Sequence, residues 1–149
     1  MKIAIASDHG GFDLKEKLSE YMKSKQIQVE DLGCYSKESC DYPLIGYELS
    51  IAVAKGDFDQ GVLICTTGVG MSITANKVNG IRAGLCHNSE QAAMSRQHND
   101  TNVLVLGAKF LDDKTAAAIL EAWLKTDFED HNRHQRRVNQ MKDIERKTE

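Results

Sequence analysis

The sequence lacks the features that mark several special classes of protein. Its 149 residues contain no apolar run of the roughly 20 residues that a membrane-spanning helix needs. The amino-terminal segment MKIAIASDHGG turns acidic and glycine-rich after a short apolar stretch, which is not the pattern of a secretion signal. The formal net charge is only −3, so the overall charge does not favour nucleic acid or an anionic membrane as a partner. We therefore expect a cytoplasmic protein with no membrane and no nucleic-acid partner.

Paired cysteines, linkers and repeats are also missing. The four cysteines, Cys34, Cys40, Cys65 and Cys86, form no C-x-x-C pair of the kind found in metal sites, which favours reduced thiols. There is no low-complexity tract and no internal repeat. A composition of 41% apolar and 28% charged residues is that of a globular protein. The length suits one domain, over residues 1–149, with a sizeable core.

What the sequence does contain is a regular alternation of helix-like and strand-like segments. The helix-like segments repeat apolar residues at helical spacing, as at Leu14, Leu18 and Met22, and one begins at Pro43, a residue suited to a first helical turn. The strand-like segments are apolar without alternation, as in strands buried on both faces of a parallel sheet; they are residues 2–7, 27–32, 61–65, 81–86 and 102–107. The sequence thus predicts a three-layer α/β fold with a five-stranded, mostly parallel sheet.

Polar side chains follow two of the predicted strands, at the edge where open parallel sheets bind their ligands. Asp8 and His9 follow the first strand, and the third strand ends in Cys65, Thr66 and Thr67. Each has a structural alternative: Asp8 can cap the following helix, His9 can be an ordinary hydrogen-bonded loop residue, and a free cysteine is often a small buried apolar group. We expect these five residues to meet at one edge of the sheet.

The stretch CTTGVG joins a buried strand to a predicted helix. Gly68 and Gly70 allow a tight turn there, and the unpaired N–H groups at the start of a helix attract negative charge. Such amides would make it easier for the thiol of Cys65 to ionise and would stabilise an oxyanion formed beside it. A plain strand–helix turn is the alternative, because the G-x-G spacing alone is a weak pattern.

His98 and Asn99 stand just before the fifth strand, at the opposite edge of the predicted sheet from Cys65. One chain would therefore not bring them to the thiol. A neighbouring subunit could deliver them, and an ordinary loop histidine is the alternative for His98.

The end of the chain, residues 131–149, is basic. Arg133 and Arg137 are four residues apart and would share one helix face, and a guanidinium pair suits a phosphate dianion. The alternative is a solvated charged face. Val138 and Met141 form a thin apolar stripe on the same helix, which favours docking on another surface such as a second subunit.

Taken together, five stretches resemble the B-type ribose-5-phosphate isomerases, which share a superfamily with galactose-6-phosphate isomerases. They are KIAIASDHGGFDLK at the amino terminus, DYP at 41–43, GVLICTTGVGMSITANKVNGIRA at 61–83, SRQHNDTNVLVLG at 95–107 and RHQRRV at 133–138. The resemblance implies a Rossmann-like fold and interconversion of ribose 5-phosphate and ribulose 5-phosphate, with no metal and no organic cofactor. It further implies active sites shared between the subunits of a homodimer or homotetramer.

The resemblance also implies roles for individual residues. Cys65 matches the base that moves a proton between C1 and C2 of the sugar, and His98 matches the group proposed to open the furanose ring. Asp8 resembles the carboxylate that binds hydroxyls and assists ring opening, and Thr67 a residue suggested to help proton transfer. The remaining matches are substrate contacts: the anion hole formed by Thr66, Gly68, Val69 and Gly70, the sugar contacts Tyr42 and Asn99, and the phosphate ligands His9, Arg133 and Arg137.

Two positions depart from the pattern of these isomerases. Thr66 stands where many relatives have glycine, so a backbone with positive φ would be strained there. Lys109 stands where relatives often have arginine, which removes bidentate phosphate binding. Two other functions stay open: isomerisation of a six-carbon sugar phosphate such as allose or galactose 6-phosphate, and phosphosugar binding without catalysis.

Overall fold

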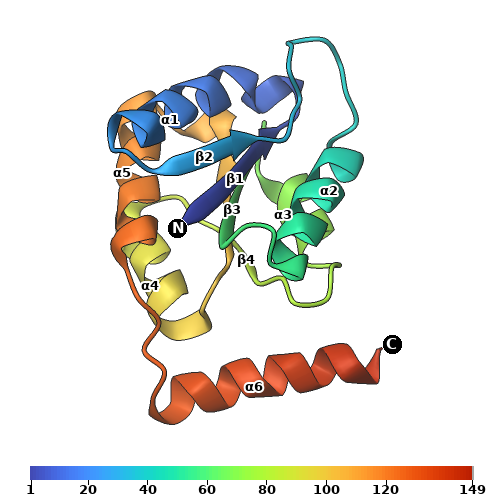
Figure 1. The fold of residues 1–149 in the computed structure, drawn as a ribbon, viewed down its shortest axis with the longest axis vertical. Helices are drawn as coiled ribbons and strands as arrows, with labels where there is room; N and C mark the ends of the chain where they lie inside the picture. The colour runs from blue at the N-terminus through green and yellow to red at the C-terminus, as the bar shows by residue number, and fades with distance from the viewer. Residues whose placement is uncertain (149) are drawn as a thin grey trace.

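The computed structural model describes residues 1–148, with Asn132 described by its backbone alone. These residues form a sheet of five strands: β1 (Lys2–Ser7), β2 (Gln28–Asp31), β3 (Gln60–Cys65), β4 (Ala83–Leu85) and β5 (Val103–Gly107). The strand order is β2-β1-β3-β5-β4, and all four pairings are parallel. The predicted Rossmann-like α/β fold is confirmed, and the sheet is wholly parallel rather than mostly so (Figure 1).

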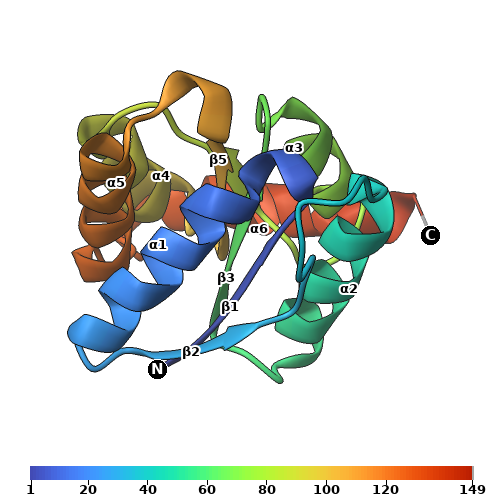
Figure 2. The same cartoon turned by 90° about the horizontal axis from the view of Figure 1, so that it is seen from above.

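Helices cover both faces of the sheet (Figure 2). One face packs against α1 (Phe12–Ser24), α4 (Ser89–Asn99) and α5 (Asp113–Lys125), and the other against α2 (Tyr42–Lys55) and α3 (Val69–Ala75). Side chains along β1 alternate between the two layers, because Ile3 and Ile5 join the first core while Ala4 and Ala6 join the second. Both faces are buried, which explains why the strands read as unbroken apolar runs.

Pro43 occupies the first turn of α2, as its sequence position predicts, and Gly56 ends that helix in the left-handed conformation with φ of 84°. The connection from β2 to α2, residues 32–41, runs at the carboxyl edge of the sheet and is the long loop at the top of Figure 1. Since α2 begins at Tyr42, directly after this loop, the course of the loop sets the position of the Tyr42 side chain.

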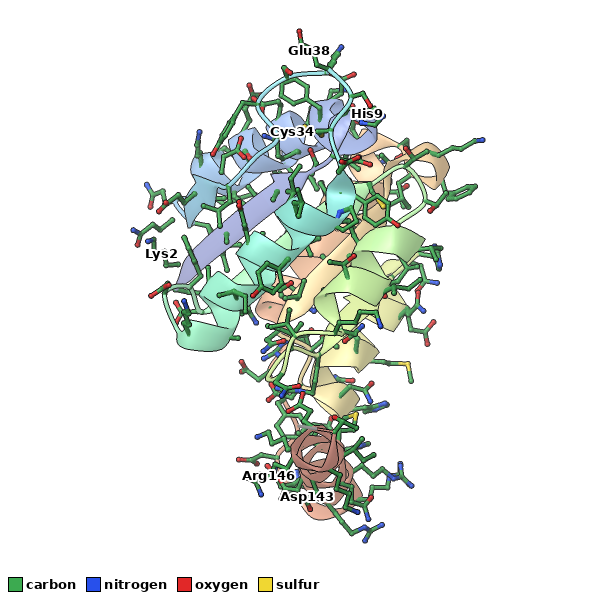
Figure 3. All side chains as sticks on the ribbon, turned by 90° about the vertical axis from the view of Figure 1, so that its right-hand side faces the viewer. Lys2, His9, Cys34, Glu38, Asp143 and Arg146 are labelled. Atoms are coloured by element: carbon green, nitrogen blue, oxygen red, sulfur yellow. The ribbon has the colours of Figure 1, made fainter. Side chains whose placement is uncertain are left out.

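The last helix, α6 (Asn132–Lys147), lies apart from the three layers, at the opposite end of the molecule from the loop of residues 32–41 (Figures 1 and 3). Val138 packs against the chain itself and is 1% exposed, whereas Met141 and Ile144 are 36% and 58% exposed. The predicted apolar stripe is therefore partly used within the chain. Within residues 1–148, no helix has the length and apolar character to cross a membrane.

Candidate active site

The carboxyl ends of β1 and β3 meet at a cavity of about 390 Å³. The two strands are neighbours in the sheet, so the residues that follow them are brought together as predicted. The lining includes seven of the residues singled out from the sequence, together with Ile73; the seven are Asp8, Tyr42, Cys65, Thr66, Thr67, Val69 and Gly70.

Cys65 is the last residue of β3 and is 4% exposed, but it lines this cavity rather than lying wholly among apolar side chains. The backbone N–H of Gly68 donates to the Cys65 sulfur at 3.2 Å. Gly68 has φ of 81°, and a Cβ there would lie 2.4 Å from Cδ1 of Leu85. Only glycine therefore gives the turn that aims this amide at the sulfur.

Thr66 and Thr67 form the exposed rim of the cavity. The hydroxyl oxygen of Thr67 accepts the N–H of Val69 at 3.3 Å, which leaves the hydroxyl proton of Thr67 available for another acceptor. Within residues 1–148, the non-glycine residues with positive φ are Gln26 and Asp100, so Thr66 is not strained. Its side chain fills space left by Gly10, where a Cβ would lie 2.1 Å from Oγ1 of Thr66.

Asp8 both caps a turn and lines the cavity. Its Oδ1 accepts the N–H of Gly11 at 3.1 Å, so the structural role considered for it is confirmed, and the residue is 6% exposed. A second cavity of about 570 Å³ adjoins the first through Asp8 and Tyr42, and it is also lined by His9 and Cys40. The Nδ1 of His9 accepts the N–H of Cys40 at 3.3 Å, which places the proton of a neutral His9 on Nε2.

Lys15 supports this edge of the sheet and was not identified from the sequence. Its side chain is fully buried, and its ammonium group donates to the carbonyl of Cys34 at 2.8 Å and pairs with Asp31 and with Glu16. The loop of residues 32–41 is thereby anchored where it leaves β2. The available signal was position, because Lys15 stands three residues before Leu18 and seven before Met22 on the buried side of α1, whereas a lysine is normally read as solvated.

His98 and Asn99 lie at the opposite edge of the sheet, at the end of α4. The register pairs Cys65 with Gly107, at the end of β5, while Asn99 precedes Val103, at its start. Four steps of parallel strand at about 3.3 Å each separate the two edges by about 13 Å. The chain therefore does not bring His98 to Cys65, as the sequence order implied.

His98 has a neighbour that the sequence analysis did not assign to the site. The rings of His98 and His134 stack with centroids 4.4 Å apart and an angle of 6° between their planes. Burial, and then the nearby positive charges of His98 and Arg133, lower the pKa of His134, while Glu129 acts in the opposite direction. A cavity of about 590 Å³ beside the stack is lined by Glu129, His131, Arg133, His134 and Arg136.

Arg133 and Arg137 are both exposed on α6, at the same edge as His98. The end of α4 is fixed there by Asp100, which pairs with Arg82 at 2.9 Å and with Arg96 at 3.0 Å. The predicted residues thus form two groups at opposite edges of the sheet. Within residues 1–148, no three His, Cys, Asp or Glu side chains are grouped to hold a metal ion.

Comparison with known proteins identifies the family of this chain. The family model described as Ribose/Galactose Isomerase matches residues 3–141. The chain therefore belongs to this family of isomerases.

Individual relatives match over nearly the whole chain. Ribose-5-phosphate isomerase B of Escherichia coli is 44% identical over 98% of this chain and 97% of its own length. The structure of ribose-5-phosphate isomerase B from Clostridium thermocellum has a TM-score of 0.98 with 46% identity and covers all of both chains. The enzyme of Mycoplasma genitalium, solved with bound ribulose-5-phosphate, has a TM-score of 0.92 with 43% identity over 97% of this chain and 96% of its own.

Proposed function

We propose that this protein is a cytoplasmic enzyme that interconverts D-ribose 5-phosphate and D-ribulose 5-phosphate. The observation that carries the proposal is the Cys65 sulfur, which accepts the N–H of Gly68 while it lines a cavity with Asp8 and Thr67. A thiol supplied with an amide donor at the wall of a cavity that also holds a carboxylate and hydroxyl groups is a suitable base for carbon acid chemistry. The names of the relatives in E. coli and C. thermocellum support a five-carbon substrate.

The thiolate of Cys65 would take the proton from C2 of the open-chain aldose, giving a cis-enediolate, and return it to C1. The negative charge that develops on oxygen needs donors. The N–H groups of Gly68 and Val69 already have partners within the chain. We therefore assign the stabilisation of the enediolate to the other amides of residues 66–70 and to the hydroxyl of Thr67, whose proton is free to turn toward the substrate.

The phosphate would lie in the second cavity, beside His9. Cys40 fixes Nδ1 of His9 as an acceptor, so a neutral His9 can donate from Nε2 to a phosphate oxygen. Binding of the distant phosphate would then hold the reacting carbons next to Cys65, and no metal ion is required for any of these steps.

Opening of the sugar ring requires groups that one chain does not bring to the cavity. We propose that a second copy places its His98, Asn99, Arg133 and Arg137 against the carboxyl edge of the first. His98 would pass the ring proton together with Asp8, and the two arginines would complete the phosphate site. The exposure of Arg133 and Arg137 on α6 is consistent with ligands that complete a site on another copy.

A six-carbon sugar phosphate is the second candidate substrate, because the family model covers both ribose and galactose isomerases. Incubation with ribose 5-phosphate, allose 6-phosphate and galactose 6-phosphate in parallel, each with and without a chelator, decides between them. We expect turnover of ribose 5-phosphate to be fastest and unaffected by the chelator. Faster turnover of a six-carbon substrate would reject the assignment, and a protein that is active as a monomer would reject the shared site.

A further inference from the structure

Two cysteines that take no part in the proposed chemistry stand at the two ends of one loop. Cys34 and Cys40 lie in the connection between β2 and α2, and both are tied to the end of β1. The N–H of Cys34 donates to the carbonyl of Ser7 at 2.6 Å, and the N–H of Cys40 donates to Nδ1 of His9 at 3.3 Å. Since Ser7 and His9 are separated by one residue, the loop returns to its starting point. Figure 3 shows Cys34 and His9 at the same end of the molecule.

The two thiols are close together and accessible. Burial, and then the neighbouring Cys34, raise the pKa of Cys40, and the thiol of Cys34 donates to the carbonyl of Ser36 at 3.2 Å. Both residues are half-buried, and the five residues between them are exposed. By contrast, Cys65 and Cys86 are 4% and 1% exposed. A small reagent thus reaches the loop pair more easily than the other two thiols.

We propose that Cys34 and Cys40 form a reversible disulfide when the protein meets a low-molecular-weight disulfide such as oxidised glutathione. The thiolate of Cys34 attacks one sulfur of the reagent and releases one glutathione, leaving a mixed disulfide. Cys40 then loses its proton and attacks the Cys34 sulfur, which releases the second glutathione. Two protein thiols are oxidised, one glutathione disulfide is reduced, and the two protons leave with the released glutathione.

The order of attack follows from the difference in setting between the two thiols. The raised pKa of Cys40 disfavours its thiolate, so the attack begins from Cys34, whose thiol gives up its hydrogen bond to the carbonyl of Ser36 when it reacts. Closing the bond brings the two sulfur atoms to about 2.05 Å. Lys15 and Ser7 hold the backbone of Cys34 through its carbonyl and its N–H, so Cys40 is the residue that moves.

Movement of Cys40 would reach the proposed phosphate site, a consequence that rests on the proposed function. Cys40 lines the cavity that contains His9, and its N–H is the group that orients the His9 ring. Oxidation would weaken that hydrogen bond and leave Cys65 unchanged. We therefore expect weaker binding of a sugar phosphate with little change in the proton-transfer step.

The first measurement is the intact mass of the reduced protein after exposure to oxidised glutathione, followed by peptide mapping. The expected result is loss of two hydrogen atoms and a peptide that links Cys34 to Cys40. Cys34→Ser and Cys40→Ser should each keep a single glutathione adduct instead, and Cys86→Ser should behave as the unchanged protein. A lasting adduct on the unchanged protein, or a link to Cys65, would overturn the pairing.

The second measurement is steady-state kinetics of the oxidised and re-reduced protein with ribose 5-phosphate. Loss of one hydrogen bond to His9 predicts a KM raised about threefold with kcat retained, reversed by a dithiol reductant. The double variant Cys34→Ser/Cys40→Ser, which has neither thiol of the pair and can carry no adduct there, should show no such change when it is treated in the same way. If the link forms but KM stays the same, its effect on the site is rejected. The mass result stands by itself even if ribose 5-phosphate is not a substrate.

Discussion

The two edges of the sheet hold the predicted site residues in different ways. At the carboxyl edge, Cys65 ends a central strand, pairs in register with Gly107 and receives the N–H of Gly68. At the amino edge, His98 ends a helix, and Arg133 and Arg137 lie exposed on α6, outside the three layers. The group proposed to move protons is thus fixed by the sheet, whereas Arg133 and Arg137 are exposed and His98 is half-buried against the ring of His134. The proposed shared site therefore combines one group that the sheet holds rigidly with groups that a second copy would have to supply.

The carboxyl edge makes the strongest prediction. Cys65→Ser removes the base, and we expect kcat for the isomerisation to fall about 10³-fold, within the range for loss of a positioned acid–base group. The substitution is nearly isosteric, so the melting temperature should change little. Turnover of ribose 5-phosphate and thermal unfolding, measured on the same samples, check both parts.

Cys86→Ser is the matched control, because Cys86 is also buried but lies in the other core layer. It should keep full turnover. Near-normal kcat in Cys65→Ser would remove the base from the proposal and leave the cavity without an assigned proton carrier.

The second prediction tests whether the two edges work together across copies. Cys65→Ser and His98→Asn should each be inactive alone. When the two variants are unfolded and refolded as a mixture, one of the two sites in a mixed dimer regains both groups, so about a quarter of the activity should return. The recovered rate and the mass of the species in solution are the measurements.

Refolding each variant separately and mixing the products at the time of assay is the control, and it should give no recovery unless subunits exchange. If co-refolded mixtures stay inactive while both variants form dimers, each site is confined to one chain. The separation of about 13 Å between the edges would then need a large rearrangement within the chain.

The third prediction concerns how Thr66 fits its turn. Gly10→Ala would place a Cβ 2.1 Å from Oγ1 of Thr66, and we expect it to lower the free energy of unfolding by about 1–3 kcal/mol, as overpacking does. Thr66→Gly removes the obstructing side chain, so the double variant should regain most of that loss. Denaturant unfolding of the two single variants and the double variant measures the coupling.

The result would be additive if the loss of unfolding free energy in the double variant equalled the sum of the losses in the two single variants. Glycine at position 10 would then be required by its own backbone conformation and not by the side chain of Thr66.

Much of the fold could be predicted because it depends on patterns that are local in sequence. The unbroken apolar runs identified buried parallel strands, and the residues after β1 and β3 were expected to meet because parallel strands share their carboxyl edge. The same reasoning correctly separated His98 from Cys65 within one chain. The structural alternative for Asp8 was also correct, since it caps a turn while lining the cavity.

Other features depend on contacts between distant segments, which no local pattern reveals. Lysine is the residue type of a solvated helix position, and only the packing of α1 against the end of β2 and the loop after it buries Lys15 beside Asp31 and the carbonyl of Cys34. By sequence, His134 is one of several polar residues in the basic segment 131–149. No local pattern predicts that its ring stacks on the ring of His98. Backbone strain at Thr66 was considered from the residue type alone. In the structure Thr66 does not have a positive φ, so its backbone is not strained.

The smallest predicted effect lies at the amino edge and concerns the docking of α6. The pKa of His134 is lowered, first by burial and then by the positive charges of His98, Arg133 and Arg137, against the opposing effect of Glu129. The unfolded chain therefore binds a proton at His134 more readily than the folded chain does. The contribution of His134 to stability is complete above its ordinary pKa of 6.5 and declines as the pH falls below that value.

Protonation of His134 would place a positive charge against the ring of His98 and loosen the stack that holds α6. Hydrogen exchange in residues 132–147 should therefore become faster between pH 7 and pH 5, after correction for the intrinsic exchange rate, while exchange in β3 stays constant. His134→Phe keeps a ring against His98 but cannot take up a proton, so its exchange in α6 should be independent of pH over the same range. Equal pH dependence in the two proteins would assign the loosening to another group, and the amino edge would then be as firmly fixed near neutral pH as the edge that carries Cys65.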